Sequence, residues 1–294
     1  MGTADAQRNE LGEFLKARRA ELTPARAGLP DSGTLRRVPG LRREEVAQLA
    51  AISTDYYTRV EQGRLQASTP VLTTLARALQ LDEDQTAYVL GLAAKRRSRA
   101  PGQAARRVRP QLQRLLDQLT DAPALVLGRH MDILAWNSLA AALIKDFDAL
   151  PRPECNYLRL AFIDPDVRRL FTDWKTTART CVAYLRMDAM QYPDDPRLAA
   201  LVGELSVKDP DFRKWWAAHD VAHKTCGTKT LHHPVAGTLT VVWEMLGCAT
   251  DPDQQLMVMT AAPGSHSHDA LHFLASWTRT TPSPATTPDL RGHS

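Results

Sequence analysis

The sequence predicts two domains, an all-α domain at the N-terminus and an α+β domain after it. Three observations lead to this expectation. Amphipathic helical patterns, separated by Gly, Pro and Ser, follow one another over residues 8–94. Residues 95–110 are basic and contain Pro and Gly, which predicts a linker. In residues 111–277, strand-like runs lie on both sides of a block of helical patterns, as in an α+β domain.

The elements of the first domain follow from apolar spacing and from capping residues. Ser53 is typical of an N-cap and Gly63 of a helix end. Residues 23–40 are rich in Pro and Gly and interrupt the helical pattern. The expected helices span residues 8–20, 42–50, 54–62, 70–80 and 82–94.

The second domain is expected to begin with a helix over residues 111–119 and a hairpin. The hairpin strands, 124–127 and 131–136, are separated by Gly128-Arg129-His130. Helical patterns then fill residues 137–220, and a closing helix is expected over 268–277. The later strands are expected over residues 229–232, 238–246 and 255–260. Residues 278–294 are rich in Thr, Pro and Ser, which predicts a disordered tail.

Composition fits this organisation. The 294 residues are 44% hydrophobic and 24% charged, which excludes a collagen-like or low-complexity chain. No apolar run approaches the ~18 residues of a membrane span, and residues 1–10 lack the apolar stretch of a secretory signal. The 4 cysteines form no C-x-x-C pair, which indicates reduced thiols. We therefore expect a cytoplasmic protein without a membrane partner.

Charge is unevenly distributed. Residues 1–110 contain 19 Lys and Arg against 12 Asp and Glu, whereas the remainder contains 18 against 21. A basic N-terminal part is typical of a protein that contacts a polyanion, although a solubility effect without a partner would look the same.

Residues 42–64 decide between these alternatives, because two short helical patterns joined by a tight turn are typical of a helix-turn-helix. The apolar positions expected between the two helices are Val46, Leu49, Ile52, Tyr57 and Val60. The outer face of the second helix would then enter a major groove near its N-terminus. The candidate base-contacting residues on that face are Thr54, Asp55, Thr58 and Arg59, with Tyr56 as a candidate for contacting a sugar or a thymine methyl group.

This segment resembles the phage-repressor (XRE-type) helix-turn-helix family, in which the second helix is followed by Glu-x-Gly, as in Glu61-Gln62-Gly63. The resemblance implies a five-helix, phage-repressor-like DNA-binding domain. Ala51 departs from the pattern, because the family usually has Gly in the turn. If the backbone is left-handed there, Ala would cost about 1 kcal/mol. A five-helix bundle that binds no DNA is the alternative, but the coincidence of motif, turn and basic residues favours DNA binding.

The roles of the charged residues can be divided further. Arg59 is suited to bind guanine. Asp55 either accepts from cytosine or orients a neighbouring residue, or it only favours the helix dipole. The resemblance gives Arg43 two possible roles, touching phosphate or bracing the recognition helix. The remaining candidates for phosphate contacts are Arg36, Arg37 and Arg42. Arg64 adds to the local basic charge and is a further candidate DNA-binding residue.

Motifs beyond the helix-turn-helix extend the resemblance over most of the chain, from about Leu11 to Trp277. The motifs are residues 37–47 and 55–59, Ala135-Trp136-Asn137, residues 192–196, Trp215-Trp216, and His233-Pro234 with Gly237. They resemble the MmyB-like transcriptional regulators. This resemblance implies a PAS-like α+β domain that encloses a fatty-acid-like molecule in some members. The ligand of this chain does not follow from it.

Most of the large apolar side chains of the second domain are expected to form its core. A ligand cavity needs an apolar lining and a few polar groups at its mouth. The candidate ligand-binding residues are Trp136, Asn137, Phe171, Trp174, Arg179, Arg186, His232 and His233.

The sequence thus predicts a DNA-binding transcription regulator that senses a small apolar ligand and has no cofactor, metal or catalytic residues. A homodimer is expected, since one helix-turn-helix contacts only a short half-site. One alternative is a second domain that binds another protein and no ligand. Another is a metalloenzyme that uses His219 and His223, which are spaced as on one helical face. Asp220 stands where Glu would be needed, so its reach is too short for a general base.

Overall fold

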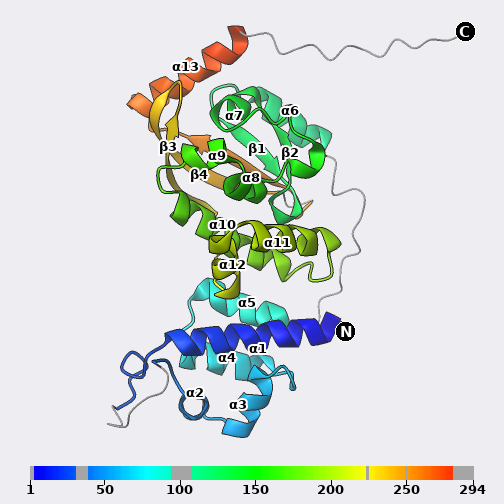
Figure 1. Cartoon of the computed structure of the whole chain (residues 1–294), viewed down its shortest axis with the longest axis vertical. Coiled ribbons are helices and arrows are strands. Elements are labelled where there is room, and N and C mark those ends of the chain that lie inside the picture. Colours follow the sequence, from blue (N-terminus) through cyan, green and yellow to red (C-terminus); the bar gives the residue numbers. More distant parts are fainter. Residues whose placement is uncertain (1–2, 31–38, 94–107, 223–224, 249–250, 281–294) are drawn as a thin grey trace, which may run out of the picture. The chain divides into compact units, whose positions relative to one another are not determined.

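The computed structural model describes residues 3–30, 39–93, 108–222, 225–248 and 251–280 (Figure 1). The chain divides into two compact units. The first comprises residues 1–103 and 175–224, and the second comprises residues 104–174 and 225–294. Residues 175–224, which the sequence pattern predicted to be part of the second domain, thus belong to the first unit. Arg36, Arg37 and most of the predicted linker and tail lie outside the described residues.

The first unit is helical, as predicted for residues 8–94. Its N-terminal helices are α1 (Thr3–Glu21), α2 (Arg43–Leu49), α3 (Thr54–Glu61), α4 (Thr69–Ala78) and α5 (Glu83–Ala93). Three later helices join them: α10 (Trp174–Ala189), α11 (Pro196–Lys208) and α12 (Pro210–Ala217). Among the described residues, no helix is both long and apolar enough to cross a membrane.

One buried cluster holds the first unit together. It includes Phe14 of α1, Val46 of α2 and Tyr57 of α3, none of which exposes side-chain surface. The sequence predicted that five apolar side chains lie between α2 and α3. Val46, Tyr57 and Val60 are buried, whereas Leu49 and Ile52 are partly buried and pack against the cluster. These contacts fix α3 against α2 and against α1.

The second unit is an α+β domain, as the sequence predicted. Its helices are α6 (Pro110–Gln118), α7 (Ser138–Leu143), α8 (Tyr157–Ile163), α9 (Pro165–Leu170) and α13 (His266–Thr280). Its strands are β1 (Ala124–Leu127), β2 (Ile133–Trp136), β3 (Cys226–His233), β4 (Gly237–Gly247) and β5 (Gln255–Thr260). Each predicted strand is present, and the long helical pattern between β2 and β3 is divided among several helices.

The strands form one antiparallel sheet in the order β2-β1-β5-β4-β3. The predicted hairpin joins β1 to β2, and the turn before Gly237 joins β3 to β4. Gly237 has φ +72°, a conformation that suits glycine. Directly paired residues share a face of an antiparallel sheet. Lys229 is paired with Val241 and Leu231 with Leu239, so Lys229 lies on the face that β4 buries.

Candidate DNA-binding and ligand-binding sites

The turn before α3 has the geometry that a helix-turn-helix requires. The Ser53 hydroxyl accepts a hydrogen bond from the Tyr56 backbone N–H at 3.1 Å and caps α3, as the sequence predicted. Ala51 has φ +51°, so the residue that departs from the family pattern does adopt the left-handed conformation. The turn is therefore formed in spite of the steric cost of a Cβ at this position.

A buried carboxylate fixes the C-terminal end of α3. The Glu61 side chain is 1% exposed and pairs with Arg19 of α1 at 2.6 Å and with Arg43 of α2 at 2.6 Å. The hydrogen bond and the charge of Glu61 raise the pKa of Arg43. Of the two roles considered for Arg43, these contacts support the second, in which Arg43 braces the recognition helix. Burial of an unpaired carboxylate would be costly, so the pairs with Arg19 and Arg43 stabilise Glu61 in its buried position.

The candidate base-contacting residues are grouped on one exposed part of α3. Thr54, Asp55 and Arg59 are exposed, whereas Thr58 and Tyr56 are half-buried. Arg59 lies 3.9 Å from Asp55, one helical turn away, so the two side chains form an exposed ion pair. This pairing fits one of the roles considered for Asp55, that of orienting a neighbouring residue.

Two further candidate DNA-binding arginines, Arg42 and Arg64, lie among the described residues. The backbone N–H of Arg42 donates to the Glu45 carboxylate at 2.6 Å, and its guanidinium lies 3.5 Å from Glu44. Arg64 is exposed just after α3. Arg42 thus directly precedes α2 and Arg64 follows α3, so the two residues flank the helix-turn-helix in the chain.

The candidate ligand-binding residues are divided between the two units. Arg179 and Arg186 lie on the part of α10 that belongs to the first unit. The second unit contains Trp136, Asn137, Phe171, Trp174, His232 and His233.

Asn137 is fully engaged within the second unit. Its Nδ2 donates to the carbonyls of Leu119 and Ala122, and its Oδ1 accepts from the backbone N–H groups of Ala124 and Ala140. This side chain caps α7 and ties it to β1. No local sequence pattern separates such a role from that of a ligand anchor.

His233 is also occupied by protein groups. Its Nε2 lies 3.0 Å from the Ala142 carbonyl, and its Nδ1 accepts from the backbone N–H groups of Val235 and Ala236. His232, in contrast, is exposed and contacts Thr238.

The aromatic candidates are largely buried. The Trp174 indole donates to the Ala161 carbonyl at 2.6 Å. Phe171 pairs with Leu231 in an isolated β-bridge. Trp136 is half-buried and packs against Phe147, with 5.2 Å between ring centroids.

One polar group on the buried face of the sheet was not predicted from the sequence. Lys229 Nζ lies 3.0 Å from the Tyr157 hydroxyl and within 5.7 Å of the ring centroids of Tyr157, Phe171 and Trp243. We call these four residues the Lys229 cluster. The sequence signal for this cluster is the two-residue spacing of Lys229 and Leu231. Residues two apart on a strand share a face, so this spacing places the lysine on the apolar side of the strand.

The predicted two-histidine helix face is wrong. Helix α12 ends at Ala217, and His219 has φ +55°, which is outside the helical region. His219 Nδ1 lies 3.2 Å from Glu10 and 3.1 Å from Arg186, so it belongs to a polar network. His223 lies outside the described residues. Among the residues that the structure describes, no group of three or more His, Cys, Asp or Glu side chains is arranged to hold a metal ion.

The fold and the exposed face of α3 define a helix-turn-helix DNA-binding protein with an attached α+β domain. Two family models agree with this class. Residues 10–89 match a helix-turn-helix domain, and residues 108–274 match the MmyB-like transcription regulator ligand binding domain. The second match covers more than half of the chain, so the chain belongs to the MmyB-like transcription regulators. No curated protein sequence matches it significantly.

Proposed function

We propose that the protein is a one-component regulator in which a fatty-acid-like molecule, bound by the second unit, changes operator affinity. The main support is that one chain joins a helix-turn-helix domain to a domain of a ligand-binding family. A regulator of this kind acts in the cytoplasm, where it meets its DNA. The ligand acts only through its different affinities for the DNA-competent and DNA-incompetent conformations.

On the DNA side, we assign base contacts to the exposed residues of α3, with Arg59 binding guanine. The arginines around the motif neutralise phosphates and position the helix without specifying sequence. A homodimer presents two α3 helices to two half-sites. The basic N-terminal part of the chain supports this assignment.

On the ligand side, the Lys229 cluster is the proposed anchor for the carboxylate of a fatty acid. A cation among Tyr157, Phe171 and Trp243 offers charge to the headgroup and apolar surface to the adjoining chain. An inward-pointing lysine on an edge strand has a second explanation, since it discourages pairing with another sheet edge. The two explanations predict different effects of removing the charge.

The experiment combines lipid analysis with thermal unfolding of the full chain. Organic extracts of gently purified protein are analysed by mass spectrometry, and a panel of medium-to-long fatty acids is then tested. We expect bound acyl chains, a raised melting temperature and altered operator affinity. A free fatty-acid concentration one hundred times its Kd should raise the free energy of unfolding by about 2.7 kcal/mol.

Lys229→Met tests the anchor, and Lys208→Met, which removes an exposed lysine that pairs with Glu204, is the control. Lys229→Met should abolish the preference for a free fatty acid over its methyl ester, whereas Lys208→Met should retain it. If Lys229→Met keeps the preference and promotes self-association, the lysine protects the edge strand. If no fatty acid binds or co-purifies, the sensor assignment fails and a protein-binding second unit takes its place.

A further inference from the structure

Helices α10–α12 share the core of the DNA-binding unit, although they lie within the residues that match the ligand-binding family. Val221, which follows α12, is part of the buried cluster of α1–α5, and Met187 and Met190 of α10 pack against it. Gly91 of α5 allows this approach, because a Cβ there would lie 2.5 Å from Met190 Sδ. The segment 175–224 is thus packed as an integral part of the first unit.

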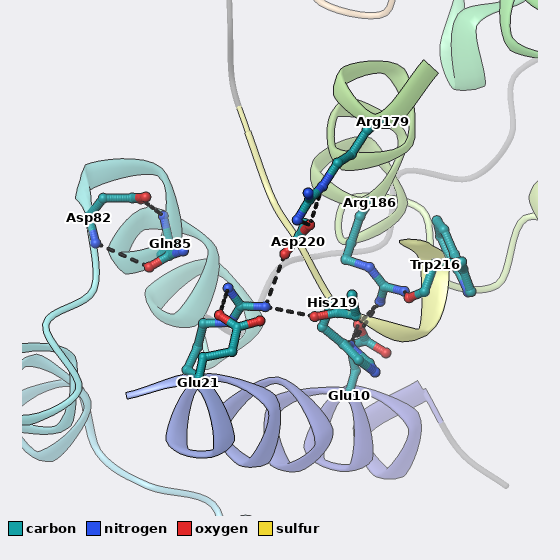
Figure 2. A network of polar contacts seen from close by, with 11 residues as sticks. Glu10, Glu21, Asp82, Gln85, Arg179, Arg186, Trp216, His219 and Asp220 are labelled. Atoms are coloured by element: carbon teal, nitrogen blue, oxygen red, sulfur yellow. Dashed lines mark hydrogen bonds and ion pairs between the residues drawn. The ribbon is translucent and has the colours of Figure 1, made fainter. Parts of the chain in front are cut away.

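A polar network joins the same segment to α1 (Figure 2). The Arg186 guanidinium donates to the Glu10 carboxylate and to the Trp216 carbonyl, and its side chain is 3% exposed. Tyr88 of α5 also donates to Glu10, at 2.7 Å. Burial alone would raise the pKa of Glu10, but the hydrogen bond with His219 and the charge of Arg186 lower it to about 2. Glu10 is therefore charged at neutral pH and holds a buried cation.

A second set of contacts lies two turns further along α1. Arg18 donates to the Ala218 carbonyl at 2.6 Å and to the Asp220 carboxylate at 3.1 Å. Asp220 in turn accepts from Arg179 of α10 at 2.7 Å (Figure 2). The Arg18 side chain is buried, so this pairing also compensates a charge removed from water.

Helix α1 has a different face for α3. A Cβ at Gly12 would lie 2.3 Å from the Glu61 carbonyl oxygen, which shows how closely α1 and α3 approach. Arg19, seven residues later, pairs with the Glu61 carboxylate. At about 100° per residue, Gly12 and Arg19 lie on the side of α1 roughly opposite Glu10. Helix α1 therefore lies between α3 on one side and the segment 175–224 on the other.

We infer that Arg186 is a positioning residue for DNA recognition: through Glu10, it lets helices α10–α12 set the position of α1 and thereby that of α3. This inference deepens the proposed function, because it identifies a route from the ligand-binding family region to the recognition helix. It rests on that function only for the direction of regulation. The mechanical link between α10–α12 and α1 is testable without ligand or DNA.

The first experiment measures hydrogen exchange in the full chain. Arg186→Met leaves Glu10 without its cation, so we expect amides of α1 and α12 to lose protection by about tenfold. The strands β1–β5 should be unchanged. Arg169→Met, which removes an arginine paired with Asp166 on the surface of the second unit, is the matched control. Unchanged protection in α1, or an equal loss in the strands, would overturn the link.

The second experiment compares two DNA affinities, for the best duplex selected from random sequences and for a scrambled duplex. We expect Arg186→Met to weaken selected-site binding roughly 5- to 50-fold and scrambled binding less than about twofold. A loss of folded protein would lower both affinities equally, which is the result that contradicts positioning. Glu10→Gln keeps an acceptor for Tyr88 and serves as the milder variant, with the same expected direction.

Two further variants separate positioning from simple destabilisation. Arg186→Lys retains the charge beside Glu10 and should recover much of the selectivity for the selected duplex. The double variant Glu10→Gln/Arg186→Met should be no worse than Arg186→Met, because the two residues act as one pair. Additive losses would contradict the pairing. Failure to select any duplex would refute the proposed function, whereas the hydrogen-exchange result would still decide the link.

Discussion

At the scale of single residues, Ala51 is the clearest example of a local cost retained in a functional motif. Its φ of +51° places a Cβ where glycine would avoid the steric penalty. We expect Ala51→Gly to stabilise the first unit by about 0.5–1 kcal/mol, measured as a higher urea midpoint with unchanged slope.

The matched control is Ala199→Gly, at an exposed interior position of α11 in the same unit. The helix holds this residue at negative φ, where alanine is not strained. Glycine loses more conformational freedom on folding, so the substitution should destabilise the first unit by about 1 kcal/mol. Equal destabilisation by both substitutions would mean that the left-handed conformation of Ala51 does not lower the free energy of unfolding.

At the scale of elements, the residues proposed to recognise bases lie on α3, whereas the arginines proposed to position the helix on phosphates lie outside it. Arg59 is an exposed residue on the outer face of the helix. The substitution Arg59→Ala should therefore reduce the preference for a particular base at one base pair of each half-site. The expected cost is about 1–3 kcal/mol for the best sequence if the contact is bidentate. Selection from random DNA with the wild type and the variant measures the change, and an unaltered selected motif would rule out this role.

The control pair is Arg36→Ala with Arg37→Ala, which tests the proposed phosphate contacts outside the described residues. These substitutions should weaken binding to all sequences about equally. They should also reduce the salt slope by roughly 0.9 for each phosphate that the variant no longer neutralises.

Local elements of this fold could be predicted from sequence, but their partners could not. Helical spacing and the Ser53 cap located α3, and alternation located β3 and β4. The amphipathic pattern of α10 predicts a helix with a buried side, yet any apolar partner would satisfy it. Its contact with Glu10 joins residues 176 positions apart, which no local pattern reports. The same limit explains why Arg186 was grouped with the ligand candidates.

The site residues show a similar division. Exposed polar positions on α3 follow directly from helical geometry once the apolar face is known. The structural role of Asn137, a candidate ligand-binding residue, could not be predicted, because its partners include backbone carbonyls in a loop 15 to 18 residues away. The prediction that His219 lies on a helix is wrong because α12 ends at Ala217 and the backbone of His219 has positive φ. The spacing of two histidines carries no information about where a helix ends.

At the scale of the whole molecule, α10 belongs to both units. Its first residue, Trp174, is counted with the second unit and is hydrogen-bonded to Ala161, whereas Lys175 onward is counted with the first. The part of α10 in the first unit contains Arg186, the residue that binds Glu10.

If the second unit senses an acyl chain that alters DNA binding, thermodynamic linkage requires the reverse effect. Operator binding must change the affinity for the acyl chain by the same factor by which the acyl chain changes operator affinity, and such factors are typically about 5–150. We expect the two factors to agree when the fatty acid giving the largest thermal shift and the selected duplex are titrated in both orders. Arg186→Met should bring both factors towards one while leaving acyl binding itself intact, since Arg186 is not part of the Lys229 cluster proposed as the anchor. Factors of one in the wild type would show two independent sites, and an undiminished factor in Arg186→Met would place the coupling outside the Glu10–Arg186 contact.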